Sequence, residues 1–224
     1  MSKVDIIIPV HNNFELVKRC VETILDSVTS NWSKIGQLII VDDHSTEGDL
    51  KEYFNNSEGN FYYPPAEIDS PYINFIKTPQ RSYFSGAVNF GSEFVTSKYM
   101  MIMNSDTKVY THKWITIMMD EFESEKDLAI LSPSIVGYFN PEPTTNVPEF
   151  GQSMIGACCW MLETEYFKNI GKLLQHEKYV HWHSDAEFCE RVVADGKKIG
   201  RSSAYIQHWG GQGNKFVEPH IPRG

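Results

Sequence analysis

Short apolar runs that end abruptly in acidic turns are the feature that most constrains this chain. The run 99–103 (Tyr-Met-Met-Ile-Met) leads straight into Asn-Ser-Asp at 104–106, and the β-branched run 37–41 leads into two aspartates at 42–43. Continuous apolar runs of this length are typical of strands that are buried on both faces of a sheet. Open α/β sheets bind ligands outside the carboxyl ends of such strands. The two acidic strand ends therefore predict a shared crevice at one edge of a sheet.

Helical periodicity between the apolar runs predicts a mostly parallel sheet. Apolar residues recur at helical spacing from Leu16 to Val28, between a strand at 4–10 and the strand at 35–41, and so complete one βαβ unit. Further along, the pattern predicts a helix at 49–56, an exposed loop at 55–71, strands at 72–77 and 98–103, and helices at 85–97 and 112–124. This alternation implies an α/β fold with a mostly parallel central sheet flanked by helices.

The second half of the chain continues the α/β pattern after a loop. Pro141, Pro143 and Pro148 exclude regular structure in the segment that follows the apolar run 128–136. Beyond them we expect a strand at 153–162, helices at 163–170 and 185–194, and a final strand at 198–206. No repeat or convincing linker divides the chain, so residues 1–224 are predicted to form a single domain.

Composition narrows the class of protein. A chain of 224 residues can bury a sizeable core without a disulfide or a structural metal. Its formal net charge of −9 argues against nucleic acid as a partner, because phosphate contacts require clustered Lys and Arg. The four cysteines lack CxxC spacing, as expected of reduced thiols in a reducing compartment. The first apolar run is too short for a signal peptide or a membrane span, so we expect a soluble, cytoplasmic protein with no integral membrane segment.

Seven short segments, taken in order, carry a resemblance to a known family. They are Ile6–Asn12, Val41–Thr46, Phe84–Gly91, Met103–Thr107, Gly156–Met161, Ser184–Arg191 and His208–Gly211. Each segment is weak alone, but their order and spacing are specific and span nearly the whole chain. The sequence resembles the family-2 glycosyltransferases with the GT-A fold, particularly bacterial rhamnosyltransferase-like members. The resemblance implies a Rossmann-like domain with a nucleotide-sugar-binding half at 1–110 and an acceptor-binding and catalytic half at 111–224.

The resemblance implies an inverting, metal-dependent enzyme that moves a sugar from a nucleoside-diphosphate sugar to a hydroxyl group of a saccharide acceptor. A donor of the UDP or dTDP type is expected, with rhamnose as the transferred sugar. The leaving diphosphate is best stabilised by a divalent cation with oxygen ligands. Asp106 matches the last position of the family's DxD motif and His208 matches its C-terminal histidine, so both are expected to bind Mn²⁺ or Mg²⁺. Asn104 replaces the first carboxylate of the motif, which suggests looser metal binding.

Activation of the acceptor hydroxyl requires a well-placed base. By resemblance this base is Asp185, the aspartate of the family's Glu-Asp motif, although Ser184 stands where the glutamate usually is. A Ser-Asp pair fits a helix N-cap equally well, and the two roles are compatible. Glu187 is expected to orient Arg191, its i+4 neighbour, rather than to catalyse.

Residues at several strand ends are expected to contact the donor. By resemblance, Asp42, with Asp43 nearby, accepts hydrogen bonds from the base or the ribose, and Arg81 meets the diphosphate. The glycines of the segment Phe84–Gly91 are more typical of close packing than of a phosphate loop. The complete set of expected donor-binding residues is Pro9, Val10, His11, Asp42, Asp43, Arg81, Asn89, Asn104 and Ser105.

Plainer interpretations stay open alongside this one. An aspartate after a buried strand is often a turn residue or a helix cap, and this applies to Asp42, Asp43 and Asp106 taken singly. A nucleotidyltransferase that makes sugar nucleotides has a similar core, but the glycine-rich, basic phosphate loop that it needs near the amino terminus is missing. A catalytically silent sugar-nucleotide or carbohydrate-binding module of the same fold is suggested by Asn104 and Ser184.

Overall fold

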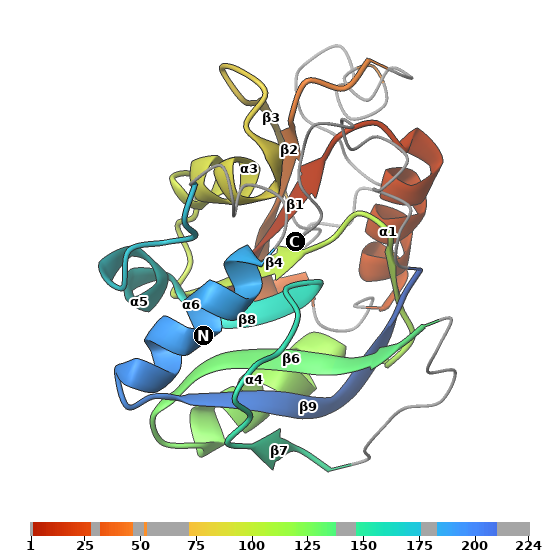
Figure 1. Ribbon diagram of the computed structural model, residues 1–224. Coiled ribbons are helices and arrows are strands. Elements are labelled where there is room, and N and C mark those ends of the chain that lie inside the picture. Colours follow the sequence, from red (N-terminus) through yellow and green to blue (C-terminus); the bar gives the residue numbers. More distant parts are fainter. Residues whose placement is uncertain are drawn as a thin grey trace.

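The computed structural model describes residues 2–27, 32–46, 52, 72–137, 147–175 and 183–209. The predicted helix at 49–56, apart from residue 52, the predicted loop at 55–71 up to residue 71 and the prolines Pro141 and Pro143 lie outside the described residues. The described elements are strands and helices that alternate along part of the chain, whereas beyond residue 99 several described strands, and then the last two described helices, follow one another directly (Figure 1).

Apart from the helix expected at 49–56, of which only residue 52 is described, the first part of the chain contains the predicted strands and helices in the predicted order. Its elements are β1 (Val4–Val10), α1 (Phe14–Ser27), the 3₁₀ turn η1 (Trp32–Lys34), β2 (Ile35–Asp42), β3 (Tyr72–Lys77), α3 (Tyr83–Ser92) and β4 (Tyr99–Met103). Helix α3 ends five residues before the predicted end at residue 97. The backbone N–H groups of Thr96 and Ser97 donate to the buried carboxylate of Asp5, over 2.8 and 3.1 Å, and so are held outside any helix.

The part of the chain after β4 begins with a short strand that hydrophobic periodicity could not detect. Its elements are β5 (Thr107–Val109), α4 (Trp114–Ser124), β6 (Leu128–Val136), β7 (Glu149–Phe150), β8 (Cys159–Glu163), α5 (Thr164–Asn169), α6 (Ser184–Ala194) and β9 (Lys198–His208). Strand β8 is shorter than the predicted strand at 153–162, because residues 153–158 approach it as irregular chain. Strands β5 and β7 are too short to give a pattern with a period of two residues.

The strands form one mixed sheet with the order β3-β2-β1-β4-β8-β6-β9-β5, and β7 pairs with β9. Among the described strands, β1, β2, β3, β4, β6 and β9 run in one direction, and β5, β7 and β8 run in the other. The sheet is therefore mostly parallel, as predicted. The insertion of antiparallel β8 between β4 and β6 is the departure from a simple βαβ succession.

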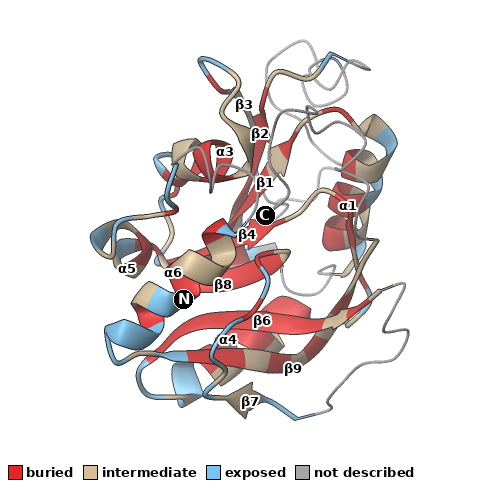
Figure 2. Cartoon of the chain, viewed as in Figure 1, coloured by how far each residue is buried: buried red, intermediate tan, exposed pale blue. Residues whose placement is uncertain are grey.

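Helices cover both faces of the sheet and give the molecule three layers (Figure 1). One face packs against α1 and α4, and the other packs against α3, α5 and α6. Alternate residues of β1 serve the two layers, since Ile6 and Ile8 face the first and Ile7 faces the second. Figure 2 shows the central strands buried along their length. Among the described residues no helix combines the length and the apolar stretch needed to cross a bilayer.

Close packing of α3 on the sheet depends on a glycine, as expected for this segment. A Cβ atom on Gly91 would lie 2.8 Å from side-chain carbons of both Ile7 and Val41. Any larger residue there would push α3 away from β1 and β2.

Candidate active site

The turn after β4 brings three predicted site residues together at one edge of the sheet. Oδ1 of Asp106 lies 3.1 Å from Nε2 of His208, so the imidazole N–H donates to this buried carboxylate. Nδ2 of Asn104 lies 3.5 Å from the same imidazole nitrogen. Ser105 lies half-buried between the two residues in the turn. The predicted association of Asp106 with His208 is therefore present in the fold.

Several hydrogen bonds fix the shape of this turn. The hydroxyl of Thr107 donates to the carbonyl oxygen of Asn104 over 2.7 Å. The backbone N–H of Asn104 donates to the carbonyl oxygen of Cys158 over 2.9 Å, which ties the end of β4 to the chain that enters β8. Thr107 also pairs with His208 between β5 and β9, so the last strand delivers the imidazole to the turn.

The possible metal ligands at this turn fit a divalent cation that is also bound by a diphosphate. Asp106 offers a carboxylate, His208 an imidazole, and the buried Oδ1 of Asn104 makes no hydrogen bond within the described residues. Oxygen ligands suit Mg²⁺ and Mn²⁺, and the imidazole favours Mn²⁺. The described residues contain no cluster of three His, Cys, Asp or Glu side chains that could hold a metal alone. Phosphate oxygens of a nucleoside diphosphate and water are ligands that would suit the remaining positions.

Asp185 lies at the same edge, in the first turn of α6. Its Oδ1 accepts the backbone N–H of Ala186 at 2.9 Å and its Oδ2 accepts that of Ala157 at 3.3 Å. The second bond crosses to the irregular segment before β8, one residue away from Cys158. Helix α6 begins at Ser184, with His183 at the N-cap position and no side-chain cap. Asp185 is thus not the N-cap residue, and two main-chain donors orient its carboxylate.

Residues 157 and 158 link Asp185 to the turn that carries Asp106. The backbone N–H of Ala157 donates to Oδ2 of Asp185 at 3.3 Å, and the carbonyl oxygen of Cys158 accepts the N–H of Asn104 at 2.9 Å. Asp106 and Asp185 therefore lie in one region of the molecule. Burial raises the pKa of the Cys158 thiol to about 12, and the charges of Asp106 and Asp185 contribute in the same direction.

Asp42 is at the same edge on the other side of β1. It is the last residue of β2 and pairs with Val10 of β1 and with Lys77 of β3. Because β2 and β4 flank β1, their carboxyl ends lie about 10 Å apart at ordinary strand spacing. The carboxylate of Asp42 accepts the N–H of Ser45 at 2.8 Å and lies 3.4 Å from the ammonium group of Lys77.

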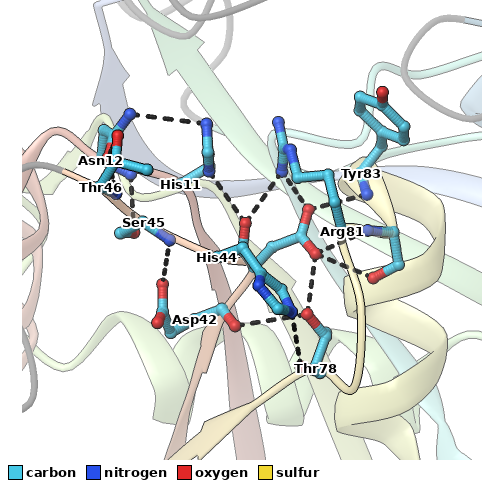
Figure 3. A network of polar contacts seen from close by, with 11 residues as sticks. His11, Asn12, Asp42, His44, Ser45, Thr46, Thr78, Arg81 and Tyr83 are labelled. Atoms are coloured by element: carbon cyan, nitrogen blue, oxygen red, sulfur yellow. Dashed lines mark hydrogen bonds and ion pairs between the residues drawn. The ribbon is translucent and has the colours of Figure 1, made fainter.

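Asp43 differs from Asp42 because hydrogen-bond donors from the protein itself occupy its carboxylate. Figure 3 labels Thr78, Arg81 and Tyr83 among the residues that supply these donors. Oδ1 accepts the Thr78 hydroxyl at 2.9 Å and the Ser82 N–H and hydroxyl at 2.7 and 2.9 Å. Oδ2 accepts the Tyr83 N–H at 2.7 Å and pairs with the guanidinium group of Arg81. These five donors exhaust the roughly four lone-pair positions of a carboxylate. Asp43 therefore anchors the start of α3, and we do not propose that it contacts the sugar-nucleotide donor directly.

His11 is held in one orientation beside this network. Its Nδ1 lies 2.9 Å from the carbonyl oxygen of Asp43, which can only accept, so Nδ1 carries the proton. Burial lowers the pKa of His11, and the nearby charge of Arg81 lowers it further. The imidazole is consequently neutral at pH 7. Pro9 is half-buried, whereas Val10 belongs to the core and its carbonyl oxygen accepts the N–H of Asp43 at 2.7 Å.

Two further residues have clear structural roles. Both polar atoms of the Asn89 side chain bind the backbone of Leu173, at 2.7 and 3.1 Å, so we do not retain Asn89 as a donor ligand. Glu187 makes a bidentate pair with Arg191 at 2.6 and 2.8 Å, as predicted from their spacing. Arg191 also donates to two carbonyl oxygens after α5 and so anchors that connection to α6.

The groups that orient these side chains were hard to predict from the sequence. The main-chain N–H of Ala157, which holds Asp185, belongs to a segment for which a regular strand was expected. Ser82, which donates twice to Asp43, directly precedes α3, and a serine before a helix is the one local signal that was available.

Similar solved structures share this architecture. GalNAc-T7, solved with UDP, GalNAc and Mn²⁺, superposes with a TM-score of 0.75 at 12% identity, over 93% of this chain and 44% of that one. The mannosyltransferase PcManGT from Pyrobaculum calidifontis, solved with GDP-Man and Mn²⁺, gives 0.68 at 12% identity, over 92% and 56%. Residues 1–349 of S. aureus TarS give 0.67 at 13% identity, over 92% and 60%. The chain therefore has the GT-A fold.

Sequence comparison agrees with the fold. The uncharacterized glycosyltransferase YibD of Escherichia coli K12 is 29% identical over 128 residues, which is 57% of this chain and 33% of YibD. The chain thus spans about a third of the length of this relative. The sequence model of glycosyl transferase family 2 matches residues 5–184, which include Asp42, Asp106 and Ser184 but stop one residue before Asp185. With most of its length matched, the chain belongs to glycosyl transferase family 2.

Proposed function

We propose that this protein is a metal-dependent, inverting glycosyltransferase that uses a UDP or dTDP sugar and a saccharide acceptor, with rhamnose as the transferred sugar. One observation carries the proposal: Asp106 meets His208 at the same sheet edge where Asp185 is oriented, and residues 157 and 158 bind both Asp185 and the Asn104–Asp106 turn. A cation-binding pair and a base in one region are what transfer from a nucleoside diphosphate requires.

The proposal divides the work between the two halves of the chain. Residues 1–110 supply Asp42, His11 and Arg81 for the nucleotide and Asp106 for the cation. Residues 111–224 supply Asp185 for the acceptor and His208, which returns to complete the cation site. Both halves contribute strands to one sheet, so they act as parts of a single domain.

The donor side of the site has the groups that a nucleoside diphosphate needs. Asp42 keeps acceptor capacity for a ribose hydroxyl or a base N–H beyond its bonds to Ser45 and Lys77. Arg81 is oriented by Asp43 and its guanidinium group stands over the ring of Tyr83, with 4.6 Å between the guanidinium carbon and the ring centroid. Two of the similar structures hold a nucleotide together with Mn²⁺, which supports the same pairing here.

Asp185 would act as the base for the acceptor. Its carboxylate accepts two main-chain N–H groups, which leaves lone pairs for the proton of an acceptor hydroxyl. As that proton moves to Asp185, the acceptor oxygen forms a bond to the anomeric carbon. The bond from that carbon to the diphosphate breaks, and the electron pair leaves with the diphosphate, so a single displacement inverts the centre. A divalent cation held by Asp106, His208 and Asn104 would supply positive charge for the leaving diphosphate.

A thermal-shift screen tests the donor assignment. UDP, dTDP and GDP, and their sugars, are added with and without Mn²⁺, because a ligand that binds only the folded state raises its melting temperature. A shift with UDP or dTDP that requires Mn²⁺ is expected. Turnover with an acceptor should then release nucleoside diphosphate, whereas release of pyrophosphate would establish the nucleotidyltransferase alternative.

The silent-module alternative has its own observation in its favour. Asn104 and Ser184 stand where family members usually carry acidic residues, and Ser184 is buried at the first position of α6. If sugar nucleotides bind and no acceptor in a broad saccharide panel gives turnover, the catalytic part of the proposal fails and the binding part stands.

A further inference from the structure

Trp209 connects the end of β9 to α1 through a contact that the proposed function does not use. The guanidinium carbon of Arg19 lies 3.7 Å from the centroid of the Trp209 ring. Arg19 is exposed on α1 and Trp209 is half-buried. This is the geometry of a cation–π contact, in which a planar guanidinium group lies over the electron-rich face of an indole.

The backbone of Trp209 is bound to the turn that carries Asp106. Its N–H donates to the carbonyl oxygen of Asp106 over 3.1 Å, and the preceding residue, His208, pairs with Thr107 across β5 and β9. The position of the indole is therefore coupled to that of the imidazole, whose Nε2 lies 3.1 Å from Oδ1 of Asp106.

The same turn of α1 also holds the other side of the cation site. The thiol of Cys20, next to Arg19, lies 3.4 Å from the hydroxyl of Thr107 and 3.7 Å from the carbonyl oxygen of Asn104. One turn further, the hydroxyl of Thr23 accepts the N–H of Val109 at 3.2 Å. Helix α1 is thus a common support for the Asn104–Asp106 turn and, through Arg19, for the segment that contains His208.

Trp209 is the last residue of the final segment that the structure describes. Its backbone N–H binds the Asp106 turn and its ring lies against Arg19, so within the described residues these are the contacts that follow His208 in the chain.

We propose that Arg19 is a positioning residue of the cation site: by holding Trp209 against α1, it holds His208 within reach of the ion bound at Asp106. The inference rests on the proposed cation-dependent binding of a nucleoside diphosphate. It assigns a function to a side chain that does not touch the ion.

Two other roles for Arg19 predict different results. If Arg19 acted only through its charge, its removal would tighten cation binding, because a positive group near a cation repels it. If Arg19 contacted the diphosphate directly, its removal would weaken nucleotide binding even without metal. The positioning role alone predicts weaker metal binding with unchanged metal-free nucleotide binding.

Calorimetric titrations of the full chain separate these roles. Mn²⁺ is titrated into the protein with saturating UDP, or with dTDP in a parallel series, and each nucleotide is also titrated without metal. The variants are Arg19→Met, Arg19→Lys, Trp209→Leu and the double variant Arg19→Met/Trp209→Leu. Arg201→Met is the matched control, since Arg201 forms its ion pair with Glu149 on β7.

The expected result is a Mn²⁺ dissociation constant about threefold to thirtyfold higher in Arg19→Met and in Trp209→Leu, as the loss of a cation–π contact implies. The Mn²⁺ dissociation constant of the double variant should exceed that of the weaker-binding single variant by no more than about twofold. The reason is that both substitutions remove the same contact. Arg19→Lys should recover part of the loss, and Arg201→Met should match the wild type. If Trp209→Leu is unfolded in the circular dichroism spectrum, the titrations of Arg19→Met and Arg19→Lys carry the test.

Three outcomes overturn the inference. The first is that Arg19→Met binds Mn²⁺ as tightly as the wild type or more tightly. The second is that the variant loses affinity for the nucleotide in the absence of metal. The third is that the increase in the Mn²⁺ dissociation constant of the double variant equals the product of the increases in the two single variants. If the wild type binds neither nucleotide with Mn²⁺, the proposed function fails first and this inference fails with it. If the wild type binds a nucleotide with Mn²⁺ and Arg19→Met binds Mn²⁺ equally well, the role of Arg19 is rejected and the proposed function stands.

Discussion

Nε2 of His208 lies 3.1 Å from Oδ1 of Asp106, although 102 positions separate the two residues in the sequence. His208 is the last residue of β9, Asp106 lies in the turn between β4 and β5, and the pairing of β5 with β9 brings the two residues together. A histidine and an aspartate that meet in this way can share a cation, and this makes the pair the most direct place to test the proposed chemistry.

Asp106→Ala should abolish the Mn²⁺-dependent part of nucleotide binding. Of the three described side chains that meet at this turn, Asp106 is the one carboxylate, so its removal leaves the neutral groups of His208 and Asn104 for a dication. We expect the thermal shift caused by UDP with Mn²⁺ to fall to the shift caused by UDP alone. Asp26→Ala, an exposed position on α1, is the control and should keep the full shift. An unchanged metal response in Asp106→Ala would remove Asp106 from the cation site.

Asp185→Asn should lower turnover by about 10²- to 10⁴-fold and leave donor binding unchanged, because a general base acts only on the chemical step. Steady-state rates and the dissociation constant of the donor are the two measurements. Glu190→Gln changes an exposed carboxylate of the same helix and should keep full activity. A loss of rate below tenfold would show that another group accepts the proton.

Cys158 should report on both site carboxylates. With a pKa of about 12, only about 10⁻⁴ of this thiol is ionised at pH 8, so labelling by a disulfide reagent should be slow in the native protein. Asp106→Asn or Asp185→Asn removes a neighbouring negative charge, lowers the pKa and should speed labelling about threefold to tenfold. Cys158→Ser identifies the signal. Equal labelling rates in wild type and both variants would place the carboxylates too far from the thiol.

Asp43→Asn should lower the free energy of unfolding by about 2–4 kcal/mol in urea titrations, since the new amide nitrogen faces buried donors and the Arg81 ion pair is lost. The exposed Asp120→Asn on α4 should change it by less than about 0.5 kcal/mol. A variant as stable as the wild type would mean that Asp43 does not anchor α3.

The neutral state of His11 predicts a pH effect on stability. Its folded-state pKa lies below the ordinary value of 6.5, so the unfolded chain binds the proton more tightly. The contribution of His11 is complete above pH 6.5 and is lost as the pH falls toward the folded-state pKa. In urea titrations at pH 7.5 and 5.5, His11→Asn should lose less stability on acidification than the wild type. An identical loss in both proteins would contradict a half-buried, neutral His11 imidazole.

Much of the fold was predictable because the burial of one helix face or of a whole strand produces a local pattern of apolar residues in the sequence. The apolar run 99–103 and the spacing from Leu16 to Val28 gave β4 and α1 nearly to the residue, since a strand and an amphipathic helix each repeat within a few positions. The placement of Asp42 and Asp106 at one sheet edge followed from the direction of parallel strands. The antiparallel insertion of β8 was not predictable, because strand order depends on pairings between distant segments.

The sequence by itself determined which residue types stand at the strand ends, and thus the candidate carboxylates of the site. Only the tertiary structure decided what each one does. It fills the Asp43 carboxylate with five donors while Asp42 keeps spare capacity, and it places His208 against Asp106. The reason is physical: hydrophobic periodicity is a property of neighbouring residues, whereas the hydrogen-bond partners of a buried carboxylate come from segments that meet only when the sheet has formed.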